Sequence, residues 1–187
     1  FRVENHYSVY NEDDDTADNF DVPDDRATWH FRGGVRWGGI EPTMSPEFGL
    51  ELSAWYELQA RTDSGPYGFS NDRRVEPISH LYWARALISY TFTNWAHHVA
   101  MSLIVGGTTD ADRFSAYRLG GLLPLVAEFP LTLPGYYFQE ISARRFILFN
   151  GRYALALDEK KRWQLSAMAA TAVVSYLPGL AQPGGGW

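Results

Sequence analysis

The sequence has 187 residues, enough for one domain with a sizeable core, and it carries a net charge of −6 and no cysteine. The acidic balance argues against a nucleic-acid-binding protein, and the lack of thiols excludes disulfides and thiolate metal sites. No stretch approaches the roughly 20 apolar residues of a membrane helix, so the sequence does not predict a helical membrane protein. Aromatic residues make up 16% of the chain beside 17 glycines, a composition that fits many β-strands.

Seven segments alternate apolar and polar residues with a period of two, which is the pattern of a strand with two different faces. In chain order they are Phe1–Tyr10, Thr28–Gly39, Gly49–Arg61, Ser79–Phe92, His97–Gly107, Arg145–Leu157 and Trp163–Tyr176. Each has 10 to 14 residues, whereas soluble strands usually have about 5 or 6 and a tilted membrane strand needs about 9 to 11. The strand lengths therefore favour a membrane protein.

The connections between these segments alternate in length. Long connections at 11–26, 62–77 and 108–144 are separated by short turns at 41–46, 93–96 and 158–162. This order is typical of outer-membrane barrels, which have long outer loops and tight periplasmic turns. Aromatic residues near the segment ends favour girdles at the two membrane interfaces.

The polar face of the predicted strands carries charges of both signs, which can pair across neighbouring strands in a hydrated lumen. The residues expected to line this lumen are Arg32, Arg36, Glu51, Glu57, Arg85 and Arg152. In a soluble sandwich the same residues would face solvent and the apolar stripes would form the core. Periodicity leaves both arrangements open, while strand length and loop alternation favour lipid.

The predicted fold class is all-β, an antiparallel up-and-down transmembrane β-barrel. A sheet edge in hydrocarbon leaves backbone groups unpaired, so sheets in membranes must close. We therefore expect residues 1–187 to be part of a single outer-membrane β-barrel domain whose further strands lie outside this sequence.

Two groups of residues suggest a functional site, one a calcium-binding loop and the other a catalytic His–Ser pair, but neither matches the pattern that such a site requires. The acidic stretch from Glu12 to Asp25 lacks the fixed glycine and terminal glutamate of a calcium loop, so it predicts a hydrated surface loop. His98 and Ser102 share a strand face but lie roughly 13 Å apart along it, too far for a hydrogen bond. No catalytic residue, metal site or cofactor is predicted, and the protein is not expected to be an enzyme.

The long connection and the strand after it hold the most specific motifs. They are Asp112-Arg113-Phe114, Tyr117-Arg118-Leu119-Gly120-Gly121, Leu133-Pro134-Gly135-Tyr136 and the run from Arg145 to Tyr153. From Asp112 to Tyr176 the chain resembles the C-terminal barrel domain of the bacterial surface-antigen family, the outer-membrane assembly and translocation proteins. Those barrels carry a double glycine after an Arg-Phe, then a Leu-Arg-Gly-Tyr or Val-Arg-Gly-Phe element in a long loop, then a strand leading to a short turn.

The resemblance implies roles for seven residues. Gly120 and Gly121 would be the glycine pair, Arg118 would lie beside it, and Leu133, Pro134, Gly135 and Tyr136 would form a loop tip that folds back into the lumen. Two positions depart from the family pattern. Pro134 stands where the family has an arginine that anchors the tip, and Arg152 stands where an acidic residue is common.

The resemblance also implies a function in the bacterial outer membrane, the insertion or translocation of proteins or lipids without a cofactor. The implied partners are membrane lipid, unfolded outer-membrane or secreted proteins and periplasmic accessory proteins, with periplasmic repeats upstream of the barrel. Two alternatives stay open. One is a passive pore whose mixed-charge lumen sets selectivity, and the other is a soluble all-β binding or hydrolytic domain.

Overall fold

The structure is a computed structural model that describes residues 1–14, 16–39, 47–92, 97–121, 131–137, 139–158 and 162–177. Its strands are β1 (Arg2–Ser8), β2 (Phe20–Asp21), β3 (Arg26–Gly38), β4 (Phe48–Arg61), β5 (Pro66–Phe69), β6 (Arg73–Arg74), β7 (Ile78–Phe92), β8 (His97–Thr109), β9 (Tyr117–Leu119), β10 (Ile141–Ala156) and β11 (Gln164–Tyr176). Within these ranges no helix is long and apolar enough to cross a membrane.

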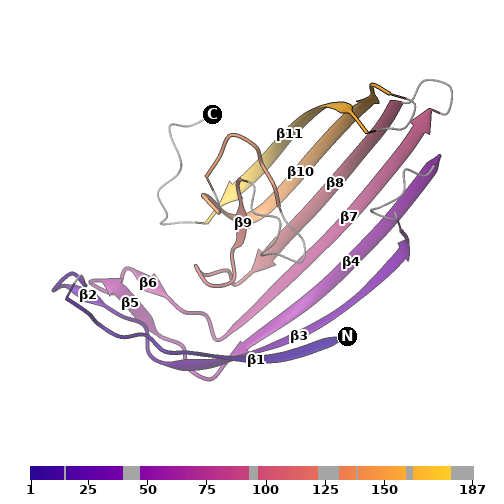
Figure 1. The fold of residues 1–187 in the computed structure, drawn as a ribbon. Helices are drawn as coiled ribbons and strands as arrows, with labels where there is room; N and C mark the ends of the chain where they lie inside the picture. The colour runs from indigo at the N-terminus through magenta and orange to yellow at the C-terminus, as the bar shows by residue number, and fades with distance from the viewer. Residues whose placement is uncertain are drawn as a thin grey trace.

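Seven strands form one antiparallel sheet in the order β1-β3-β4-β7-β8-β10-β11. Each long strand pairs with the next long strand of the chain, so the connectivity is up-and-down. The sheet curls into half of a barrel, with β1 and β11 at its two edges (Figure 1). The predicted all-β antiparallel fold and its seven strands are confirmed, while the predicted turns at 41–46 and 93–96 lie outside the described residues.

The register collects the apolar residues of the long strands on one face. Trp37 pairs with Leu52, Leu52 with Ala86, Ala86 with Leu103, and Leu103 with Phe149, which makes one apolar row across five strands. We call this the convex face, because the long connection carrying β9 lies in the hollow on the other side (Figure 1). Its exposed large side chains include Trp29, Phe31, Val35, Trp37, Leu52, Tyr56, Tyr82, Ile88, Tyr90, Met101, Leu103, Val105, Ile147, Phe149 and Val173.

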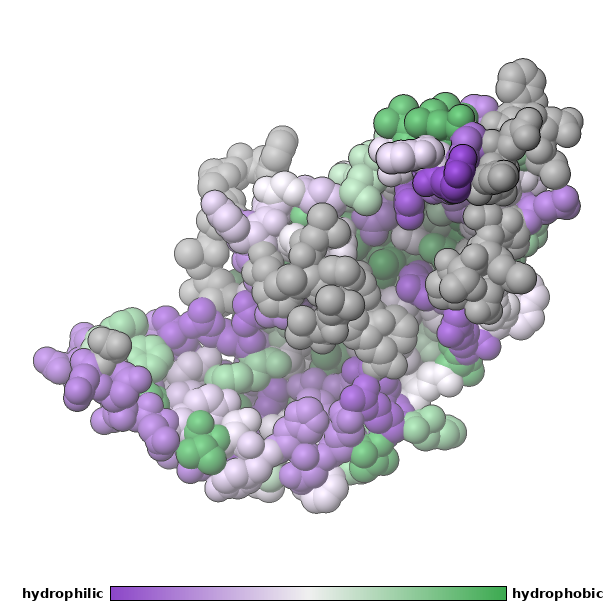
Figure 2. Space-filling view, in the orientation of Figure 1, coloured by the Kyte–Doolittle hydropathy of each residue, from purple (hydrophilic) through white to green (hydrophobic). Residues whose placement is uncertain are grey.

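The first two long connections, predicted as loops, contain a further three-stranded sheet in the order β2-β5-β6. Phe20 pairs with Phe69, and their ring centroids lie 5.0 Å apart in an edge-on contact. The Arg73 guanidinium lies 5.4 Å from the Phe20 ring centroid. These strands form an arm that extends beyond the main sheet and has a largely hydrophilic surface (Figure 2).

The close contact of β3 with β4 at Gly34 gives a stability prediction. A Cβ at Gly34 would lie 2.7 Å from both the Ala54 carbonyl oxygen and the Trp55 Cβ, whereas a Cβ at Gly151 meets nothing nearer than 3.7 Å. We expect Gly34→Ala to lower the free energy of unfolding by about 1–3 kcal/mol through overpacking. Gly151→Ala is the matched control and changes the free energy of unfolding by less than about 0.5 kcal/mol. Urea unfolding followed by tryptophan fluorescence checks this, and equal effects of the two substitutions would contradict it.

Candidate functional site

The concave face, opposite the convex face, holds the polar and charged positions of the long strands. Arg32 pairs in register with Glu57, and Ser53 lies between Arg36 and Arg85. The structure places all six of the predicted lumen charges on this face. Side chains alternate between the two sides of a strand, and each of the six lies an odd number of residues from the apolar positions of its own strand. Two of these charges, both glutamates of β4, are the centres of ion-pair clusters.

Glu51 is the centre of the first cluster. Its carboxylate accepts a hydrogen bond of 2.6 Å from the Arg36 Nη2 of β3 and another from the Arg85 guanidinium of β7. The Glu51 side chain is only 3% exposed, whereas that of Arg36 is 62% exposed. One buried carboxylate therefore ties three neighbouring strands together, and one of its arginines reaches into open space.

Glu57 is the centre of the second cluster. The Arg32 Nε donates to one carboxylate oxygen at 2.6 Å, while the other oxygen accepts from the Gln59 amide at 2.8 Å and contacts the His30 Nδ1 at 2.9 Å. The Arg32 guanidinium also lies 4.4 Å from the Trp55 ring centroid, in a cation–π contact. Arg32 is thus fixed by its carboxylate partner and by an aromatic surface at once.

A third pair, between Arg61 and Asp112, joins the sheet to the long connection. The Arg61 Nη1 lies 3.1 Å from an Asp112 carboxylate oxygen, and both side chains are 2% exposed. Asp112 also accepts hydrogen bonds from the backbone N–H of Ser115 at 2.8 Å and from that of Glu76 at 3.0 Å. Sequence reasoning did not single out this pair, because a loop aspartate and a strand arginine 51 residues apart share no local pattern.

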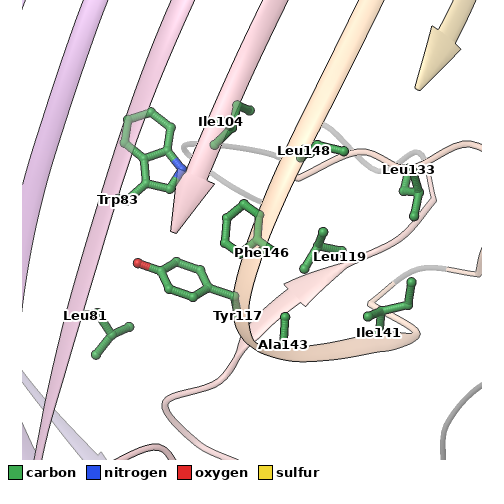
Figure 3. Close-up of a cluster of buried hydrophobic side chains, with 10 residues drawn as sticks. All are labelled: Leu81, Trp83, Ile104, Tyr117, Leu119, Leu133, Ile141, Ala143, Phe146 and Leu148. Atoms are coloured by element: carbon green, nitrogen blue, oxygen red, sulfur yellow. The ribbon is translucent and has the colours of Figure 1, made fainter. Parts of the chain in front are cut away.

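The long connection folds back over the concave face and buries an apolar cluster there. Strand β9 pairs with the first residues of β10, from Ile141 to Ala143. The cluster consists of Leu81, Trp83, Ile104, Tyr117, Leu119, Leu133, Ile141, Ala143, Phe146 and Leu148 (Figure 3). The Tyr117 hydroxyl donates to the Tyr82 carbonyl oxygen at 2.8 Å and so fixes β9 against β7.

The glycine pair of the predicted loop motif lies where the connection folds back. The Gly120 N–H donates to the Leu131 carbonyl at 3.2 Å, and the Gly121 N–H donates to that of Tyr137 at 2.9 Å. A Cβ at Gly120 would overlap the Tyr137 carbonyl oxygen, so the close approach of the two segments requires a glycine.

The predicted loop tip divides into a buried and an exposed part. Leu133 is buried in the apolar cluster and Tyr136 packs against its margin, whereas Pro134 and Gly135 are exposed. Arg118 does not reach the two glutamate clusters. It donates to the Ser142 hydroxyl and, at 3.0 Å, to the Arg113 carbonyl, and its burial lowers the pKa of the guanidinium below the usual value.

The remaining candidates lie apart from these clusters. Arg152 is exposed on the concave face, between Ala100 and Met168 in register. His98 contacts the Thr91 hydroxyl at 2.9 Å, and its Nε2 lies 3.4 Å from the hydroxyl oxygen of Ser89, not of Ser102. Within the described ranges no three His, Asp or Glu side chains gather in a way that could hold a metal ion.

Comparison with known proteins gives no relative, because no protein-family model, no curated protein and no solved structure matches the chain.

The buried Arg61–Asp112 pair gives a prediction for the loop. We expect Asp112→Ala to lower the free energy of unfolding by about 3–5 kcal/mol, because it leaves the Arg61 charge buried without its partner. Asp158→Ala, which removes the exposed pair with Arg162, is the control and costs at most about 1 kcal/mol. Chemical denaturation measures both, and limited proteolysis checks for cleavage between residues 110 and 121. An Asp112→Ala protein as stable and as protease-resistant as the control would contradict the anchoring role.

Proposed function

We propose that this chain is part of a transmembrane β-barrel of the bacterial outer membrane, of surface-antigen type, that takes part in inserting or translocating proteins or lipids. The observation that carries the proposal is the contrast between the two faces of one curled sheet. The convex face is apolar and uncovered, with Trp37 65% and Val173 72% exposed, whereas the concave face holds the ion pairs. Over the described residues no second sheet or helix layer lies against the convex face.

The height of the apolar band supports a membrane position. On β7 the convex positions from Tyr82 to Phe92 are all apolar or aromatic and span ten residue steps. At about 3.3 Å per residue this is roughly 33 Å along the strand, and a tilt of about 40° reduces it to roughly 25 Å. Outer-membrane barrels have an outward apolar band of about 25 Å.

Polar aromatic pairs near the two limits of this band give further support. Near one limit the Tyr56 hydroxyl lies 2.6 Å from the His80 Nδ1, and at the other limit His97 contacts the Tyr153 hydroxyl. All four residues belong to the convex face by register. Amphipathic rings of this kind favour the headgroup region, where the ring contacts lipid and the polar atom contacts water.

The folded-back connection supports the surface-antigen type over a plain barrel. The resemblance implies a loop that enters the lumen, and the connection after β8 packs Leu119 and Leu133 into the concave face. The proposed mechanism uses this loop and a weak barrel seam rather than covalent chemistry. The proposed partners are membrane lipid, unfolded outer-membrane or secreted proteins and periplasmic accessory proteins.

A passive pore is the second candidate, and the charged part of the concave face favours it. The loop cluster lies against β7, β8 and β10, while the Glu51 and Glu57 clusters lie on β3, β4 and β7. Charges of both signs on a hydrated wall can set ion selectivity. The pore and the assembly protein would be the same barrel. They differ in that ions cross the pore, whereas proteins or lipids are inserted or translocated by the assembly protein.

Two neighbouring residues of β8 test the membrane position, because Leu103 lies on the convex face and Ser102 on the concave face. In the complete barrel that contains this chain, we expect Leu103→Arg to disfavour folding into phospholipid vesicles by about 2–4 kcal/mol, the cost of an arginine near the bilayer midplane. Ser102→Arg is the matched control and changes insertion by less than about 1 kcal/mol. The fraction folded into vesicles across a urea series measures both.

The soluble alternative predicts the reverse of this result. The unsubstituted chain would then not fold into vesicles, and it would stay in aqueous solution as a compact monomer without detergent. That outcome, seen by small-angle scattering, would contradict both membrane candidates.

Proteoliposomes that contain the complete barrel of which this chain is a part distinguish an assembly protein from a pore. We expect them to speed the folding of an added, urea-unfolded outer-membrane protein at least about threefold over empty liposomes. Gly120→Val, which displaces the connection from its contact with Tyr137, should abolish the acceleration, whereas Gly151→Ala should keep it. Ion conductance without any acceleration would favour the pore and contradict the assembly function.

A further inference from the structure

A cavity of about 330 Å³ opens on the concave face beside the Glu51 cluster. Four arginines contribute to its wall, Arg2 and Arg32 from one side and Arg36 and Arg85 from the other, and Glu51 is the acidic residue among its lining residues. Each of these arginines also pairs with a carboxylate, Arg2 with Glu4, Arg32 with Glu57, and both Arg36 and Arg85 with Glu51. The four arginines therefore exceed their three carboxylate partners by one positive charge. We propose that this cavity is a binding site for an oxyanion of the phosphate class.

Glu51 holds two of these arginines in place for a ligand. Its carboxylate contacts both Arg36 and Arg85, which lie on either side of Ser53 in register. A guanidinium has more N–H donors than one carboxylate oxygen accepts, so Arg36 keeps donors for a ligand while Glu51 fixes its position. Because the Arg36 side chain is 62% exposed, it is also the arginine that an anion from solution reaches first.

The arginine on the opposite side of the cavity is also held in position before any ligand binds. Arg32 is held by Glu57 at 2.6 Å and lies over the Trp55 ring, so its position does not depend on a ligand. Pre-positioned donors reduce the loss of side-chain freedom on binding. The Ser53 hydroxyl in the cavity wall has no hydrogen-bond partner within the described residues and supplies a further polar group.

The chemistry of this wall fits phosphate better than a neutral solute. The planar fork of an arginine matches the oxygen spacing of phosphate and carboxylate groups, and its hydrogen bonds to an anion are charge-assisted. The excess of one positive charge over the three paired carboxylates favours an anion over a neutral or cationic solute. A phosphate group can come from a free phosphate in solution or from a lipid headgroup, and both present the same oxygens.

This site does not depend on the proposed membrane function, because the cavity and its charges belong to the folded sheet itself. Titration calorimetry of the full chain in a phosphate-free buffer, with neutral detergent if the chain needs it, tests the site with two probes. One probe is inorganic phosphate and the other is short-chain phosphatidylglycerol. Saturable binding of either probe supports the site, and the stronger of the two identifies the source of the phosphate. Loss of vesicle insertion with binding intact would overturn the membrane position alone.

Three variants separate the cavity from a general charge effect. We expect Arg36→Gln to weaken binding roughly tenfold through the loss of a charge-assisted contact. Arg152→Gln removes the same charge from the same face outside the cavity and should leave the affinity within about twofold. Glu51→Gln keeps an amide oxygen that can accept from Arg36 and Arg85 but removes the competing negative charge, so it should strengthen binding at least about threefold, which a merely damaged fold cannot do. No saturable binding, or equal weakening by Arg36→Gln and Arg152→Gln, would overturn the proposal.

Discussion

The antiparallel register of the long strands is the constraint on which the rest of the structure depends. Side chains alternate between the two sides of a strand, so a slip by one residue in one pair would exchange the apolar and the charged face. The ion pairs reinforce this register, because Glu51 of β4 contacts arginines of both flanking strands, β3 and β7, and Glu57 of β4 contacts an arginine of β3. Hydrogen bonds of the backbone and of these side chains thus select the same alignment.

The concave face is divided into two parts by the connection between β8 and β10. Over β7, β8 and β10 the connection buries an apolar cluster, and Asp112 anchors it to Arg61 at the end of β4. Over β3, β4 and β7 the wall is charged and opens into the arginine-lined cavity. We propose that the two parts serve different purposes in the barrel, because an apolar cluster restricts passage while a charged wall can bind and select ions.

The sequence predicts the strands and their faces well, since period-two alternation is local. It does not predict which charges pair, because partners such as Arg36 and Glu51 meet only through the offset between neighbouring strands. The structure of the long connections is harder still to predict from the sequence. They carry no periodicity, so the β2-β5-β6 sheet and the Asp112 anchor have no sequence signal. The resemblance places the tip at 133–136 but does not indicate that Leu133 is its buried contact.

The central claim is that the convex face contacts lipid and the concave face contacts water. Since the chain has no cysteine, single cysteines can be introduced at each position from Val99 to Leu103 on β8, a range that ends before the buried Ile104, and spin-labelled in vesicles. Collision with oxygen, which concentrates in lipid, and with a water-soluble nickel chelate then reports the environment of each label. The account predicts that odd-numbered positions favour oxygen and even-numbered positions favour the nickel chelate. Equal nickel access at both sets of positions, or odd-numbered positions shielded from both reagents, would contradict it.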